Sequence, residues 1–162
     1  MPSHQQTLEQ RRAAEAWRCV TVALDQAKQK ANEALQKAQK PEERSRLEQE
    51  IRRLNTDSGK LWASYGSLAR KVPALVTSAG LGQAMAFLRA KGQSKAWDPH
   101  ELLYSHVSDW VVGQLKETGE LLDVIQHRSS EVYRQATSEA LAFLLWVKRF
   151  AEARLPEATE GP

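Results

Sequence analysis

The segment YGSLARKVPALVTSAGLGQAMAFLRAKG, residues 65–92, decides how the rest of the chain can fold. It is dense in apolar residues, and Pro73 and Gly80 mark two predicted breaks between its helical pieces. It carries four basic residues and no Asp or Glu. Longer segments with helical periodicity lie on both sides of it. The segment is therefore predicted to form the hinge and part of the core of a helical domain.

The composition of the 162 residues predicts an all-α protein. Ala, Leu, Gln, Glu, Lys and Arg dominate, and these residues favour helices. No stretch alternates Val, Ile or Thr with polar residues, so we expect no sheet. A chain that is 41% apolar and 27% charged can bury a core of its own at this length. We expect a single domain over residues 1–162, a helical bundle of about six helices.

The N-terminal part is predicted to form a long antiparallel helical hairpin. Residues 6–39 repeat apolar residues at spacings of four and three, which is typical of a narrow packing seam. The seam consists of Ala13, Trp17, Val20, Leu24, Ala27, Ala31, Ala34 and Ala38. Pro41 fits the first turn of the second helix. That helix either bends near residues 55–59 and continues to residue 72, or stops there, with Thr56 or Asp57 capping a new helix.

Proline and glycine divide the middle of the chain. Val72 should end the second helix, because the residue before a proline avoids the helical region. A short helical turn over residues 74–78 should follow. Gly80 suits a backbone with positive φ, and Gly92 should close a helix over residues 81–91.

Capping signals divide the remaining residues. Asp98, Pro99 and Glu101 predict the start of a helix over about residues 99–116. Gly119 predicts a break before a short helix over residues 120–127. Ser129 or Ser130 can cap a last helix, whose apolar run over residues 140–147 should lie in the middle of the core. Residues 156–162 are expected to form a flexible tail.

Two features bear on where the protein works. Cys19 is the one cysteine of the sequence, and its apolar neighbours predict a buried thiol that acts as a small hydrophobe. Residues 1–12 contain no apolar stretch of a secretory signal, and the run over residues 140–147 is far shorter than the ~20 residues of a membrane span. We therefore expect a cytoplasmic protein with no membrane contact.

Charge is distributed unevenly along the sequence. Residues 58–97 carry six Lys or Arg and no acid, whereas residues 98–162 carry six basic and eleven acidic residues. A basic zone without acids is expected of a surface that meets phosphates or an acidic partner. It is equally expected of a solvated helix face that happens to lack acids.

The sequence shows no catalytic constellation. His106 and Asp109 are three residues apart, which could orient a metal ligand, but no third ligand is visible. A surface histidine beside a carboxylate is the commoner case. We therefore expect no metal, no cofactor and no enzymatic activity.

Basic residues outside the apolar seams are the candidates for contact with phosphates or with an acidic partner. For Lys148 and Arg149 the alternative is local ion pairing with Glu152. Arg70, Lys71, Arg89 and Lys91 have no acid within a helical turn, and Lys95 lies in the predicted linker three residues before Asp98. Aromatic residues also occur nearby, at Trp62, Tyr65, Phe87 and Trp97, and could stack on single-stranded bases. We expect Tyr65 and Phe87 to be core residues instead.

Two blocks of sequence resemble a known family. They are ARKVPALVTSAGLGQAMAFLRAKG, residues 69–92, and YRQATSEALAFLLWVKRFAEARL, residues 133–155. In this order they resemble the small subunit of the Cmr complex, the type III-B CRISPR RNA-guided silencing machine. The blocks cover about a third of the chain. Residues 1–68 and 93–130 contribute little.

The resemblance implies a small, all-helical, non-catalytic subunit. Several copies would stack along the complex beside the backbone subunits, contact the large polymerase-like subunit and help to form the channel for guide RNA and target RNA. The resemblance does not supply the residues that touch RNA, so these are assigned from charge. They are Lys60, Arg70, Lys71, Arg89, Lys91 and Lys95, and less strongly Lys148 and Arg149.

Two other functions stay open. One is a structural spacer whose basic zone meets an acidic protein surface. The other is a metal-dependent nuclease that uses His106 and Asp109.

Overall fold

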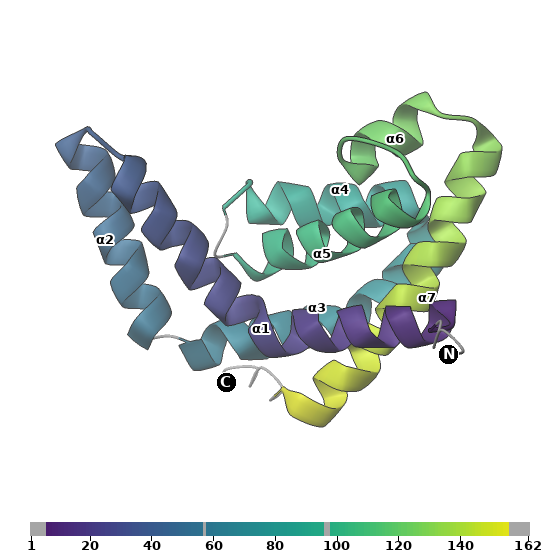
Figure 1. Cartoon of the computed structure of the whole chain (residues 1–162), viewed down its shortest axis with the longest axis horizontal. Helices are drawn as coiled ribbons and strands as arrows, with labels where there is room; N and C mark the ends of the chain where they lie inside the picture. Colours follow the sequence, from purple (N-terminus) through teal and green to yellow (C-terminus); the bar gives the residue numbers. More distant parts are fainter. Residues whose placement is uncertain (1–5, 57, 96–97, 156–162) are drawn as a thin grey trace, which may run out of the picture.

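The computed structural model describes residues 6–56, 58–95 and 98–155, and this part of the chain is all-α, as predicted (Figure 1). Its helices are α1 (Leu8–Lys37), α2 (Pro41–Thr56), α3 (Ser58–Ala79), α4 (Leu81–Gly92), α5 (Pro99–Gln114), α6 (Leu121–His127) and α7 (Ser130–Arg154). The predicted Asp57 cap, Trp97 and the predicted tail at residues 156–162 lie outside the described residues.

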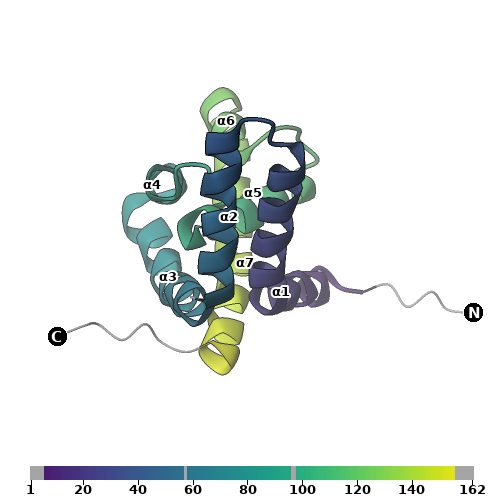
Figure 2. The ribbon, with the colours of Figure 1, turned by 90° about the vertical axis from the view of Figure 1, so that its left-hand side faces the viewer.

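The predicted hairpin is formed by α1 and α2. Thr7 starts α1 with a capping box, in which its side chain accepts from the Gln10 backbone and Gln10 bonds back to Thr7. The first half of α1 lies along the body of the molecule, and the second half runs out with α2 beside it (Figures 1 and 2). Ala31 and Leu47 are buried between the two helices. The structure describes α2 up to Thr56 and α3 from Ser58, and residue 57, where the two predicted alternatives differ, lies outside the described residues.

The prediction that a helix ends at Val72 is wrong. Helix α3 continues through Pro73 to Ala79, and Thr77 donates a hydrogen bond to the Pro73 carbonyl at 3.1 Å. A proline inside a helix costs about 3 kcal/mol. Here Val72 and Val76 are buried on the same helix, so tertiary packing of the whole face outweighs the local preference.

Glycines end helices where the chain turns most sharply. Gly80, at φ +92°, separates α3 from α4, as its predicted positive φ requires. Gly92 ends α4 against the start of α5, where an added Cβ would lie 2.7 Å from the backbone nitrogen of Glu101. Asp98 caps α5 by accepting from the His100 backbone at 2.8 Å, as the sequence predicts.

The C-terminal helix α7 packs across the body against α1 and α3. Ser129 is the residue that caps it. Phe143, Leu144 and Val147 are fully buried, but Leu145 is 53% exposed. The apolar run therefore lines the core on one side and reaches the surface on the other, so the prediction that it lies in the middle of the core is only partly right.

The core differs in one more place from the predicted seam. Cys19 is fully buried, as predicted, and burial raises the pKa of its thiol. Trp17 is 41% exposed instead of buried, because Ala16, Cys19 and Val20 form the inner face of α1. Among the described residues, no helix is long and apolar enough to cross a membrane.

Candidate nucleic-acid interface

The lysines among the predicted contact residues are available at the surface. Four of them, Lys60, Lys71, Lys91 and Lys95, are exposed, and Lys148 is half-buried. None of the five forms an ion pair with a residue in the described part of the chain. No carboxylate of that part therefore neutralises their charges.

Helix α3 carries two of these lysines along one outer face. Lys60 and Lys71 are eleven residues apart, which is about three helical turns, so they point the same way about 16 Å apart. Ser64 lies between them on this face and Ser78 lies beyond. No residue of α3 is acidic.

Arg70 serves the fold. Its guanidinium donates to the carbonyl of Leu155 at 3.1 Å and to that of Ala151 at 3.4 Å. These carbonyls lie at the C-terminus of α7, where a cation also meets the negative end of the helix dipole. Arg70 therefore joins α3 to α7 as a helix cap.

Arg89 lies at the junction of three helices. Its guanidinium contacts Glu101 of α5 at 3.1 Å and Glu120, just before α6, at 2.7 Å. It also lies 4.0 Å from the ring centre of Tyr104. Burial raises the pKa of Glu101, although the charge of Arg89 opposes this. Arg89 is thus the main compensation for a buried carboxylate.

On α7, the alternative of local ion pairing is confirmed for Arg149. Its guanidinium lies 3.2 Å from the carboxylate of Glu152. Lys148 forms no such pair with the described residues. The eight candidates therefore divide by residue type: the three arginines bind groups of the chain itself, whereas the five lysines pair with no carboxylate among the described residues.

Helices α3 and α4, which carry three of these lysines, lie on one side of the molecule. The two helices follow each other across Gly80 and lie together at the left of Figure 2, whereas α1 lies at the right. Lys148 belongs to α7, and the structure does not place it on the outer face of α3. The candidate interface consists of the four exposed lysines of α3, α4 and the loop after α4, which are Lys60, Lys71, Lys91 and Lys95.

The two aromatic residues predicted to lie in the core differ in their burial. Tyr65 is buried, as predicted, but Phe87 is 39% exposed, so the prediction that it belongs to the core is wrong. It lies on the flank of α4, away from the buried face of that helix, which is formed by Leu81, Met85 and Leu88. Its ring meets His100 edge to face, with 5.9 Å between the ring centres.

His106 is buried and bound within the protein. Its Nδ1 lies 2.7 Å from the hydroxyl of Tyr65. Burial, and then the charges of Arg18 and Lys30, lower the pKa of His106 to about 3, so the ring is neutral at pH 7. Asp109 is exposed on the same helix. The described residues contain no group of three or more His, Cys, Asp or Glu side chains that could hold a metal.

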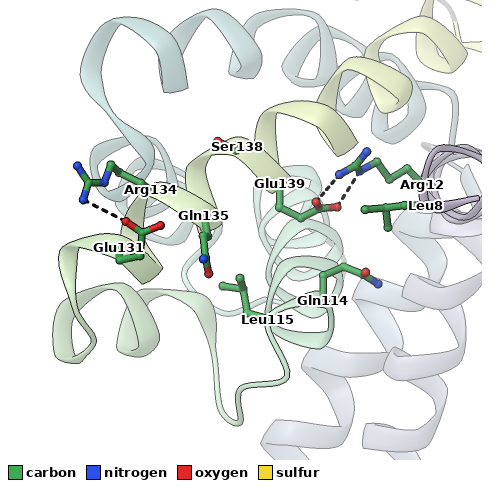
Figure 3. Close-up of a pocket in the computed structure, with 9 residues that line it drawn as sticks. All are labelled: Leu8, Arg12, Gln114, Leu115, Glu131, Arg134, Gln135, Ser138 and Glu139. Atoms are coloured by element: carbon green, nitrogen blue, oxygen red, sulfur yellow. Dashed lines mark hydrogen bonds and ion pairs between the residues drawn. The ribbon is translucent and has the colours of Figure 1, made fainter.

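A second feature, a surface pocket of about 430 Å³, had no signal in the sequence (Figure 3). It lies between the start of α1, the end of α5 and the first half of α7. Arg12 reaches across it and binds Glu139 through two hydrogen bonds of 2.9 and 2.6 Å. Arg134 pairs with Glu131 at 3.1 Å on the opposite rim. Because these charges are paired, the pocket offers a ligand little free charge.

Comparison with known proteins identifies the family. The family model described as CRISPR-associated protein (Cas_Cmr5) matches residues 26–154, which is most of the chain. The chain belongs to the Cmr5 family of CRISPR-associated proteins. A curated relative, the CRISPR system Cmr subunit Cmr5 of Thermus thermophilus, is 34% identical over 93 residues. The matched region is 57% of this chain and 76% of that protein. This confirms the resemblance to the Cmr small subunit.

The Cmr5 match places the candidate interface inside the family region. All eight predicted contact residues and the whole of α2 to α7 lie within residues 26–154. The first half of α1 lies outside the matched residues. It nevertheless contributes Ala16, Cys19 and Val20 to the core of this member.

Proposed function

We propose that this Cmr5-family protein is a non-catalytic subunit of a CRISPR Cmr effector complex that binds RNA phosphates through lysines. Its partners would be the large polymerase-like subunit, the backbone subunits, further copies of itself, and guide and target RNA. The observation that carries the proposal is a group of four exposed lysines on α3 and after it, Lys60, Lys71, Lys91 and Lys95, which pair with no described carboxylate. Lysines that neutralise phosphates give affinity without sequence preference.

The division between arginines and lysines refines the eight-residue assignment. The guanidinium groups of Arg70, Arg89 and Arg149 bind carbonyl or carboxylate groups of the protein itself. Substitution of Arg70 or Arg89 would therefore change stability together with any RNA contact, whereas the exposed ion pair of Arg149 adds little to stability. The lysines can be changed with little effect on the fold, so they give the cleaner test.

The test is a triple variant, Lys60→Gln, Lys71→Gln and Lys91→Gln, in a reconstituted complex. Removing three phosphate contacts should lower the affinity for target RNA and reduce the log–log salt slope by about 2, at about 0.7 per contact. The control, Lys37→Gln, Lys40→Gln and Lys116→Gln, removes the same charge from exposed sites on the hairpin and after α5. An unchanged slope in the first variant, or an equal change in the control, would refute the assignment.

A second candidate function is that of a protein spacer. It is favoured by the exposed apolar side chains of α1 and α7, Trp17 at 41% and Leu145 at 53%. A spacer would bury these side chains against neighbouring subunits. Crosslinking of the assembled complex separates the two functions: adducts to RNA through residues 58–95 support phosphate binding, and adducts to protein alone support the spacer.

The non-catalytic part of the proposal has its own test. It is supported by the burial of His106 and its hydrogen bond to Tyr65, which keep the imidazole from a reacting group at the surface. The complex with His106→Asn should cleave target RNA at the rate of the unmodified complex. Loss of cleavage with intact assembly and intact RNA binding would mean that the protein contributes to catalysis.

A further inference from the structure

Phe87, which is exposed, and His100, which is half-buried, form a pair of aromatic rings at the junction of α4 and α5. Phe87 is 39% exposed, and its ring meets that of His100 at 5.9 Å and an angle of 75°. Asp98 holds His100 in place, with 3.0 Å between its Oδ1 and the Nδ1 of the ring. The same carboxylate oxygen accepts the His100 backbone N–H at 2.8 Å. Both rings are therefore oriented before any ligand arrives.

The junction that carries these rings is tightly packed. Gly92 closes α4 directly against the backbone of Glu101, one residue beyond His100. Arg89 ties α4 to α5 through Glu101, whose side chain is only 9% exposed. The relative position of the two aromatic rings is thus fixed by backbone contact and by a partly buried ion pair.

The charges around the rings favour a polyanion. Lys91 lies one helical turn beyond Phe87 on the same face of α4, and helical neighbours at this spacing have Cβ atoms about 5–6 Å apart. Lys95 follows in the loop and is also exposed. Helix α4 contains no acid, and the carboxylate beside the rings is that of Asp98, which is hydrogen-bonded to His100 and is outnumbered by the two exposed lysines. An aromatic ring beside lysines that form no ion pair within residues 6–56, 58–95 and 98–155 matches the two parts of a nucleotide, its base and its phosphate.

We propose that Phe87 and His100 form a stacking site for an unpaired base of single-stranded RNA, with Lys91 and Lys95 on the adjoining phosphates. This inference rests on the proposed function and adds the base as a second point of contact. Every base has a π face, so the site would bind RNA without strong sequence preference. It predicts that part of the affinity depends on the bases and not on salt.

Abasic RNA separates the two kinds of contact, because it keeps the phosphates and lacks the bases. The full chain is titrated at about 50 mM salt with single-stranded RNA and with abasic RNA of the same length. Phe87→Ala should weaken binding of the first RNA by about 5- to 150-fold, which corresponds to the loss of one stacked base, and leave binding of the abasic RNA unchanged. Phe87→Trp should retain the affinity.

Leu145→Ala is the matched control, since it removes an exposed apolar side chain from α7, away from the lysines of α4. It should change neither affinity. Far-UV circular dichroism should stay the same in all three variants. The melting temperature should fall by no more than a few degrees in Phe87→Ala, because its ring contact with His100 is worth about 0.5–1.5 kcal/mol.

The outcomes distinguish this inference from the proposed function. Equal affinity of the unmodified chain for both RNAs, with a salt slope that Phe87→Ala leaves intact, overturns the stacking site and leaves phosphate binding in place. Absence of salt-dependent binding to either RNA overturns both. Loss of binding to a Cmr partner subunit in Phe87→Ala, with RNA affinity unchanged, means that the rings meet protein and also overturns the inference.

Discussion

The contact between Gly92 and α5 gives the sharpest prediction for the fold. In Gly92→Ala the new Cβ would lie 2.7 Å from the backbone nitrogen of Glu101 and 2.9 Å from its Cα, where ordinary contacts begin at 3.4 Å. The start of α5 would have to move by a few tenths of an ångström or more. Overpacking of this kind costs about 1–3 kcal/mol. Alanine recovers up to about 1 kcal/mol of helix preference, so we expect a net loss of about 1–2 kcal/mol.

The assay is thermal and urea unfolding followed by circular dichroism. A loss of about 1–2 kcal/mol in a chain of this length should lower the melting temperature by about 2–8 °C. Gly113→Ala is the matched control, because Gly113 lies in α5 and an added Cβ there meets nothing within 4 Å. It should leave the free energy of unfolding unchanged or raise it by up to about 1 kcal/mol.

The relative stability of the two glycine variants tests whether α4 and α5 approach each other this closely. If Gly92→Ala is as stable as Gly113→Ala, the close approach of α4 and α5 does not exist in solution. The rigid placement of Phe87 against His100, which depends on that approach, would then lose its basis.

Three further predictions concern buried charges and caps. His106 has a pKa of about 3 in the folded protein and 6.5 in the unfolded chain. Below pH 6.5 the unfolded chain binds a proton that the folded protein does not, so the free energy of unfolding should fall by up to about 1.4 kcal/mol per pH unit. His106→Asn should make this fall less steep in urea unfolding between pH 7 and 4. Arg12→Ala should cost about 2 kcal/mol at pH 7, because the mostly buried carboxylate of Glu139 loses its charged partner. The hydrogen bond from Arg12 lowers the pKa of Glu139, so the same difference should shrink as the pH falls below 4.5, and a constant difference would contradict this assignment. Arg70→Ala should cost about 1 kcal/mol through the lost cap of α7, and equal stability of the two proteins in urea would show that the cap is not formed.

Local signals in the sequence predicted the ends of helices well. Asp98 and Ser129 cap helices in the structure because a side-chain oxygen satisfies a backbone N–H only two or three residues away. Gly80 and Gly119 have the positive φ that sharp turns require. Such signals depend on neighbours in the sequence, so they can be recognised without knowing the fold.

Tertiary effects explain the failures. Pro73 lies inside α3 because the burial of that helix exceeds the local cost of proline. Trp17 fits the seam by spacing, but the inner face of α1 is centred on its neighbours. An apolar residue at the edge of a helix face has the same spacing whether a partner covers it or not, and Phe87 is exposed for that reason.

Prediction of the candidate site from the sequence was limited by the same tertiary effects. The sequence shows that Arg89 has no acid within a helical turn, but it cannot show Glu101 and Glu120, which arrive from α5 and the start of α6. Nor does it distinguish Arg70, which reaches α7, from its neighbour Lys71, which faces outward. Pairing across helices is a property of the folded chain. The basic zone was therefore predictable as a region, and its free charges were not.

The separation of lysines from arginines has a chemical consequence. Acetylation neutralises an amine and leaves a guanidinium untouched. Treatment with an acetylating agent could therefore remove the charge of Lys60, Lys71 and Lys91 while Arg70 and Arg89 still held the helices together. The positive charge of these lysines can in that sense be removed chemically while the arginine contacts between the helices stay in place.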